Sequence, residues 1–141
     1  MSESANLIPE SHKDLLERAV VVTLVTMMPD GQPQATPVWC DYDGEYVRVN
    51  TARGRQKDKN MTARPKVTVL AVDPENPYRW LEVRGVVSDM DANQEVAVAH
   101  INKLSALYRG QPDYYARMPE KRGQEDRVMI RIKPTRVVVG G

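Results

Sequence analysis

The residues between Arg48 and Lys66 are the part of this sequence whose types and spacing best suit chemistry with an anion. Counted inclusively, seven of them are lysine or arginine, and a single acid, Asp58, lies among them. Arginine offers a planar fork of donors and lysine a compact charge, and both bind phosphate oxygens. The cluster therefore indicates a site for a phosphorylated small molecule. The competing interpretation is a solvated basic helix face that binds no ligand.

Local sequence features predict that this cluster surrounds a strand-to-helix corner. A strand pattern over residues 46–51 lapses at Thr51, Gly54 frees the backbone, and the residues that follow favour a helix. The first turn of a helix exposes unpaired N–H groups at the positive end of its dipole. Because these groups add to the basic side chains, we expect an anion to bind at the corner.

The rest of the sequence offers no self-sufficient catalytic centre. It lacks the glycine-rich phosphate-binding motifs and any pair of histidines at metal-ligand spacing, so we predict no metal. His12 and His100 are isolated, and we expect structural or surface roles for both. The single cysteine, Cys40, is expected to be a small buried hydrophobe. Without a nucleophile and base pair, catalysis requires a bound cofactor.

Hydrophobic patterning indicates a mainly β protein. Strands are predicted over residues 20–28, 33–42, 46–51, 66–73, 80–90 and 128–139, the last interrupted at Pro134. Turn signals at residues 28–31 and 43–44 join the first three strands as antiparallel hairpins. Gly85, in the middle of a long strand, marks a place where a barrel strand bends.

Helical patterns flank and interrupt these strands. A short helix is predicted over residues 11–18, capped by Ser11, and an amphipathic one over residues 94–108. Residues 109–126 are expected to form an irregular loop with a helical turn near Tyr114. The longer helix is expected to cover one mouth or edge of a barrel.

These elements suit a β-barrel with α-helices, closed or split, of six antiparallel strands. We expect one domain over residues 1–141, with a flexible N-terminus over residues 1–10. An oligonucleotide-binding barrel has similar parts, so architecture alone does not separate a cofactor enzyme from a nucleic-acid module. We expect no nucleic acid as partner, because no aromatic interrupts the basic residues between Tyr46 and Tyr78.

Composition narrows the class of protein further. The net charge is +1 and 41% of residues are hydrophobic, as in an ordinary globular domain without a field that recruits nucleic acid or membrane. No apolar run of about 18 residues is present, so no membrane span is expected. The first residues lack the features of a signal peptide, and we expect a cytoplasmic protein.

Four motifs, taken together, resemble a known family. They are residues 36–39 (TPVW), 41–44 (DYDG), 50–60 (NTARGRQKDKN) and 73–85 (DPENPYRWLEVRG). In this order they are similar to the split-barrel flavin and deazaflavin oxidoreductases of the pyridoxamine-phosphate oxidase superfamily. Within it they resemble the small branch associated with the deazaflavin coenzyme F(420). The likeness covers about residues 15–139 and implies an FMN-binding split-barrel fold.

The resemblance implies cofactor-binding roles for particular residues. The matching positions are Thr36, Pro37 and Val38 for the ring, with Val38 or Trp39 as an apolar wall, Asn50, Thr51 and Ala52 for the sugar-like chain, and Arg55, Lys57 and Asn60 for the phosphate. In Tyr78, Arg79 and Trp80, a guanidinium between two rings is suited to stacking on a planar cofactor or clamping its acidic tail. The alternative is a loop that packs on a dimer partner.

The function that the resemblance implies is that of an oxidoreductase. In it, reduced coenzyme F(420) passes hydride to a small unsaturated acceptor of quinone, tetrapyrrole, furanone or nitro type. The resemblance implies a homodimer, with the cofactor between the subunits. One alternative is an FMN-dependent reductase or oxidase of the same fold. Another is a non-catalytic protein that binds flavin or haem. No side chain is nominated as the catalytic acid.

Overall fold

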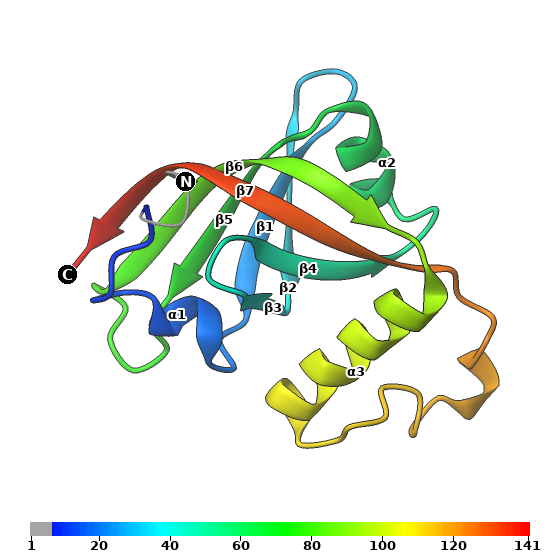
Figure 1. Ribbon diagram of the computed structural model, residues 1–141. Coiled ribbons are helices and arrows are strands. Elements are labelled where there is room, and N and C mark those ends of the chain that lie inside the picture. Colours follow the sequence, from blue (N-terminus) through cyan, green and yellow to red (C-terminus); the bar gives the residue numbers. More distant parts are fainter. Residues whose placement is uncertain (1–6) are drawn as a thin grey trace.

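A single sheet dominates the computed structural model, which describes residues 7–141. Its seven strands are all antiparallel and lie in the order β2 (Pro33–Val38), β1 (Val22–Met27), β5 (Lys66–Val72), β6 (Trp80–Asp91), β7 (Arg127–Gly140), β4 (Val47–Ala52) and β3 (Cys40–Tyr42). The sheet is curled, with β6 and β7 running diagonally across it (Figure 1). The expected mainly β class is confirmed.

The strand number is seven rather than the predicted six, because residues 33–42 form two strands and not one. The strands β2 and β3 are the two edges of the sheet, yet only Trp39 separates them in the chain. One residue spans less than 4 Å, so the sheet must curl until its edges almost meet. Trp39 therefore lies where the barrel approaches closure.

Alternating side chains of the strands build the core. Along β1 the residues alternate between buried and partly exposed, as a strand with one face on the core requires. The fully buried aliphatic side chains include Leu24, Leu81, Val83, Ile130 and Ile132. Gly85, where a bend was predicted, lies at a register shift with β7 and leaves no room for a side chain, since a Cβ there would lie 2.7 Å from both Ile132 Cγ2 and the Lys133 carbonyl.

The last strand differs from its prediction. It runs unbroken through Pro134, where an interruption was expected. The register with β6 shifts at this point, because Arg84 lies opposite Arg136 and Gly85 opposite Pro134. Thr135 is thus the extra residue of an irregularity that accommodates a proline, which has no N–H to donate.

The N-terminal helix is shorter than predicted. Helix α1 covers only Asp14–Glu17, and Ser11 does not cap it, since its hydroxyl bonds to His12 Nδ1 at 2.8 Å instead. His12 is buried, and its Nε2 lies 2.8 Å from the Gly140 carbonyl, so it has the structural role expected. Most of the expected flexible segment, residues 1–10, lies outside the described residues; Ile8, within them, packs into the core.

The two longer helices follow their predictions. Helix α2 (Gln56–Ala63) begins just after Gly54, whose φ of +91° favours glycine. Helix α3 (Gln94–Arg109) is capped by Asn93 and ends at Gly110, which is left-handed. It packs beside β4 and β7 below the sheet (Figure 1).

Tyr108, near the end of α3, ties this helix to the barrel. Its hydroxyl accepts a hydrogen bond from the Cys40 N–H at 3.0 Å and donates one to the Val20 carbonyl at 2.7 Å. Residues 110–126 follow as turns with one short 3-10 helix, Pro119–Lys121. No helix within residues 7–141 is long and apolar enough to cross a membrane.

Candidate functional site

A pocket of about 360 Å³ opens beside Trp39, where the edges of the sheet approach one another. It is bounded by the ends of β2 and β4, the start of β7, helix α3 and the segment that follows it. Its lining consists of Val21, Pro37, Val38, Trp39, Asn50, Arg55, Lys57, Ile101, Leu104, Arg109, Tyr114 and Arg127. The pocket thus combines apolar and aromatic side chains with four cationic ones.

The structure brings together five of the residues that the sequence nominated for cofactor binding. These are Pro37, Val38, Asn50, Arg55 and Lys57, which come from β2, β4, the residue before α2 and the first turn of α2. They are therefore neighbours in space although they lie in separate segments of the chain.

Thr36, Thr51 and Ala52 are next to lining residues in sequence but do not line the pocket. The hydroxyls of Thr36 and Thr51 are buried without a hydrogen-bond partner among the described residues. Ala52 is buried where β4 pairs with Arg127 at the start of β7. These three positions support the wall rather than forming its surface.

Asn60, nominated for the phosphate, lies instead in a buried polar network. Its amide nitrogen donates to Thr26 Oγ1 at 3.0 Å, and its oxygen accepts from Gln56 at 2.9 Å and from Arg64 at 3.2 Å. Both ends of the amide are thus engaged. In this structure Asn60 holds α2 against β1.

Tyr78, Arg79 and Trp80 are not brought to this pocket. Trp80 pairs with Gly140 at one end of β7, whereas Arg127 lies at the other end (Figure 1). Arg79 forms ion pairs with Asp14 and with Asp73, the latter at 3.0 Å. Tyr78 is 83% exposed.

Arg127 is the most important lining residue that sequence reasoning missed. It is only 2% exposed, and its Nε donates to Asn50 Oδ1 at 3.0 Å while Nη1 lies 3.2 Å from Glu125 Oε1. Its guanidinium carbon lies 5.2 Å from the centre of the Tyr114 ring. A charged residue opening an apolar strand was the available signal, but only the register with Ala52 places it at the pocket.

Glu125 is the carboxylate that balances part of this charge. It lies 3.4 Å from Arg55 and accepts a hydrogen bond from Tyr115 at 2.9 Å, in addition to its contact with Arg127. Burial acts to raise the pKa of Glu125, but Tyr115 and Arg127 outweigh it, so the pKa lies below its ordinary value. Glu125 is therefore ionised and shared by two arginines.

Lys57 lacks such a partner among residues 7–141. Burial lowers its pKa first, and repulsion from Arg55 and Arg127 lowers it further. Three of the four lining cations, Arg55, Lys57 and Arg127, thus lie close enough to repel one another, and Glu125 contacts two of them. No side chain caps the N-terminus of α2 beside them. A bound anion would relieve the repulsion, which is the behaviour expected of an anion site.

Aromatic rings form another part of the wall. Trp39 stacks on Tyr108 with ring centres 5.2 Å apart and planes 15° apart, and Tyr114 meets it edge-on at 6.2 Å. The guanidinium of Arg109 lies 4.7 Å from the Trp39 ring centre. Sequence reasoning placed Trp39 here but not Arg109, the last residue of α3, or Tyr114, which follows that helix. Such rings favour a planar ligand.

Cations at the corner and flat apolar surfaces nearby suit a molecule that joins a planar ring to an anionic group. Residues 7–141 contain no cluster of histidine, cysteine or acidic side chains that could hold a metal ion. The pocket also presents no pair of side chains arranged as nucleophile and base.

Comparison with known proteins gives this geometry a context. The family described as pyridoxamine 5'-phosphate oxidase matches residues 8–139. An F(420) reductase from Mycobacterium smegmatis is 37% identical, with 93% of this chain and 98% of that chain covered and a TM-score of 0.79. A comparison with curated proteins found no match.

Two more distant structures share the fold. A conserved hypothetical protein from Mycobacterium tuberculosis is 24% identical, with 94% of this chain and 84% of that chain covered and a TM-score of 0.75. A heme storage protein from Vibrio cholerae is 17% identical, with coverages of 96% and 95% and a TM-score of 0.66. At these identities the likeness concerns the fold alone.

Proposed function

The chain belongs to the pyridoxamine 5'-phosphate oxidase family, and we propose that within it the protein is an oxidoreductase that uses reduced coenzyme F(420). The acceptor would be a small unsaturated molecule of quinone, tetrapyrrole, furanone or nitro type. The observation that carries this proposal is the group of three cations at the pocket, Arg55, Lys57 and Arg127, in a chain 37% identical to an F(420) reductase.

The residues present fit such a cofactor. Arg55 and Lys57 would bind its phosphate, which supplies the negative charge that the corner lacks. Pro37, Val38 and Trp39 would lie along the ring. When bound, the reduced deazaflavin supplies a hydride from its ring carbon C5. The chain's own part is to orient the ring and to exclude water from its face, both of which accelerate transfer.

Haem is the less favoured ligand. The sequence contains two histidines, His12 and His100, and both are buried with each ring nitrogen in hydrogen-bond contact. Neither imidazole is free to ligate iron without losing these bonds. FMN remains the second candidate, because it also joins a planar ring to a phosphate and therefore suits the same pocket.

The choice between the two flavins is tested by titrating purified protein with each. We expect coenzyme F(420) to bind about 10-fold more tightly than FMN at low salt. Each exposed ion pair with its acidic tail contributes about 0.3–1 kcal/mol to the binding free energy, and FMN has no such tail. Lys59 and Arg109 are exposed and available to that tail, whereas Arg53 is paired with Asp58 at 2.8 Å.

Raising the salt concentration should shrink this preference, because salt screens exposed charges. Equal or tighter binding of FMN at low salt would favour the flavin reductase or oxidase instead. Reduction of a quinone acceptor by the loaded protein is the activity assay that follows.

Removing the phosphate contacts should weaken cofactor binding selectively. We expect Arg55→Ala and Lys57→Ala each to weaken it about 10- to 100-fold, the cost of one charge-assisted hydrogen bond. Lys59→Ala is the comparison and should weaken binding less, by about 2- to 5-fold, since Lys59 lies on the same helix but does not line the pocket and offers only an exposed ion pair to the tail. Fluorescence titration measures all three. Equal losses at the three positions would indicate diffuse electrostatics and not a formed site.

We propose further that the protein is a homodimer. Val21, Val139 and Tyr78 are exposed large side chains, at 57%, 42% and 83%. Tyr78 lies two residues before Trp80, which pairs with Gly140 at the end of β7 opposite Arg127, so it is available to a second copy. Sedimentation at micromolar concentration should show a dimer. A monomer with and without cofactor would overturn this proposal.

A further inference from the structure

A chain of four buried polar side chains runs from the edge of the sheet to the pocket. Arg127 Nε donates to Asn50 Oδ1 at 3.0 Å, Asn50 Nδ2 lies 3.2 Å from His100 Nδ1, and His100 Nε2 lies 3.2 Å from Asp41 Oδ1. None of the four is more than 8% exposed. They come from β7, β4, α3 and β3, so the contacts connect separate elements.

The direction of each hydrogen bond in this chain is determined by Arg127. A guanidinium can only donate, so Asn50 must present its oxygen to it. The amide nitrogen of Asn50 then faces the Ala97 carbonyl at 2.8 Å and Nδ1 of His100. Because that nitrogen is a donor, Nδ1 must accept. The proton of the neutral ring therefore lies on Nε2 and is donated to Asp41.

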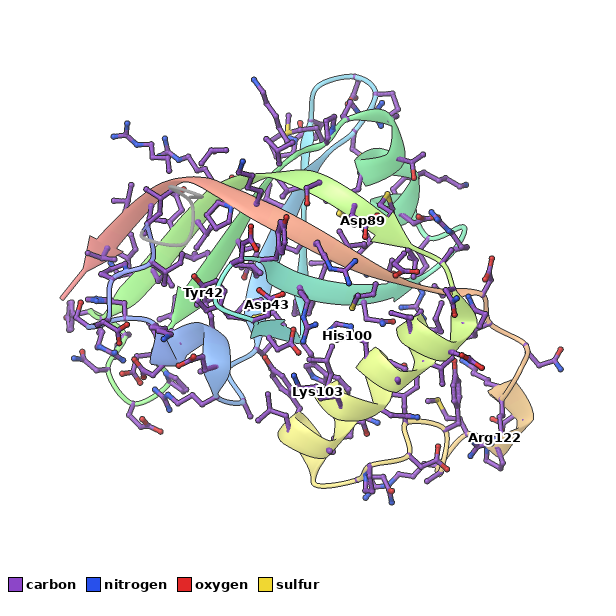
Figure 2. The ribbon with its side chains drawn as sticks, viewed as in Figure 1. Tyr42, Asp43, Asp89, His100, Lys103 and Arg122 are labelled. Carbon is purple, nitrogen blue, oxygen red and sulfur yellow. The ribbon has the colours of Figure 1, made fainter. Side chains whose placement is uncertain are left out.

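Asp41 is a fixed end for the chain. Arg48 binds both of its carboxylate oxygens, at 2.9 Å and 2.8 Å, and Lys103 approaches from the surface at 3.3 Å. Figure 2 shows His100 and Lys103 on the side of α3 that faces the sheet. Burial alone would raise the pKa of Asp41, but His100 and Arg48 lower it well below its ordinary value. Asp41 therefore remains an acceptor for His100 Nε2.

We propose that His100 and Asp41 are positioning residues that hold the Arg127 guanidinium in one orientation at the pocket, acting through Asn50. This inference rests on the proposed function only in that Arg127 is taken to face the ligand. If His100 were removed, the Asn50 nitrogen would keep only the Ala97 carbonyl as its partner, and the amide would be held less firmly. The hydrogen bond from Arg127 Nε to Asn50 would then loosen, and the guanidinium would be held mainly through its Nη1 contact with Glu125.

The first test needs no cofactor. In ligand-free protein labelled with nitrogen-15, long-range proton–nitrogen NMR should show His100 as the neutral ring protonated on Nε2. The Arg127 Nε–H resonance should exchange slowly with water in the natural protein and in Lys103→Ala, and rapidly in His100→Leu. Lys103 is the control because it lies on the same helix and contacts Asp41, but its side chain is 64% exposed.

The second test is a double-mutant cycle on affinity for coenzyme F(420), with FMN as the probe if FMN binds better. We expect His100→Leu to weaken binding about 10-fold in the natural background, but less than about 2-fold in an Arg127→Lys background. His100→Gln, whose amide offers one donor and one acceptor, should weaken binding by about 3-fold. If His100→Leu does not fold, the same double-mutant cycle is measured with His100→Gln.

Equal losses in the two backgrounds would mean that His100 serves only packing, and would overturn the proposal. A His100 ring protonated on Nδ1 would do the same. If neither flavin binds the natural protein, the proposed function fails, while the NMR comparison still decides whether His100 orients Arg127.

Discussion

Replacing Arg127 by methionine is expected to weaken binding of coenzyme F(420) by about 100-fold, the upper end for one charge-assisted hydrogen bond. Two effects act in the same direction. The pocket loses a buried donor, and Glu125, which Arg127 contacts at 3.2 Å, keeps its negative charge with less compensation. That charge would then repel the anionic ligand.

Lys133→Met is the matched control for Arg127→Met. Lys133 lies on the same strand, β7, but it is exposed and does not line the pocket. Its replacement by methionine removes the same unit of charge. Isothermal titration of both variants separates the local role of Arg127 from its contribution to the overall charge. If both substitutions weakened binding equally, the role of Arg127 would be reduced to its contribution to the overall field.

The second large effect concerns stability. We expect Asp41→Ala to lower the free energy of unfolding by about 3–5 kcal/mol, the cost of removing one partner from a buried ion pair. Asp41 is 5% exposed, and its loss would leave Arg48 and His100 without their acceptor. Urea unfolding at neutral pH measures the change. Asp30→Ala, at an exposed turn, is the comparison at which little should change.

The same carboxylate should make stability depend on pH. Because the pKa of Asp41 is lowered in the folded state, its contribution is fully present above the ordinary value of about 3.9 and is lost as the pH falls towards the folded pKa. The unfolding free energy of the natural protein should therefore fall below about pH 4, and that of Asp41→Asn should fall less.

Other acids with a lowered pKa also stabilise the folded state more at neutral pH than in acid. The unfolding free energy of Asp41→Asn should therefore still fall with falling pH, but less steeply than that of the natural protein. The pKa of Asp73 is lowered to about 2, by the Glu75 backbone N–H first and then by Arg79 and Arg18 against the opposing effect of burial. A profile for Asp41→Asn that is parallel to that of the natural protein would show that Asp41 gains no stability from its partners.

The anion corner shows what local sequence can predict about the site. Arg55 and Lys57 both line the pocket, and they lie within three residues of each other at the start of α2. Their position depends only on where β4 ends and the helix begins, which Gly54 and the lapse in alternation indicate. Short-range features of this kind are visible in the sequence.

Residues that reach the site from distant segments could not be placed in the same way. Arg127 comes to Asn50 across 77 positions of sequence, because β7 pairs with β4 in one particular register. Conversely, Asn60 has the right spacing for the corner but faces inward, where Thr26 and Arg64 satisfy it. Which face of a helix is buried depends on the elements packed against it.

The sequence by itself determined the mainly β class, the amphipathic helix over residues 94–108 and the basic corner, since each depends on a period of two to four residues or on a single glycine. Only the tertiary structure decided that residues 33–42 are two edge strands joined at Trp39, and that Arg127, Arg109 and Tyr114 meet there. The physical reason is that sheet curl and strand register arise from contacts between distant segments. A pocket formed where a barrel nearly closes depends on both the curl of the sheet and the register of its strands.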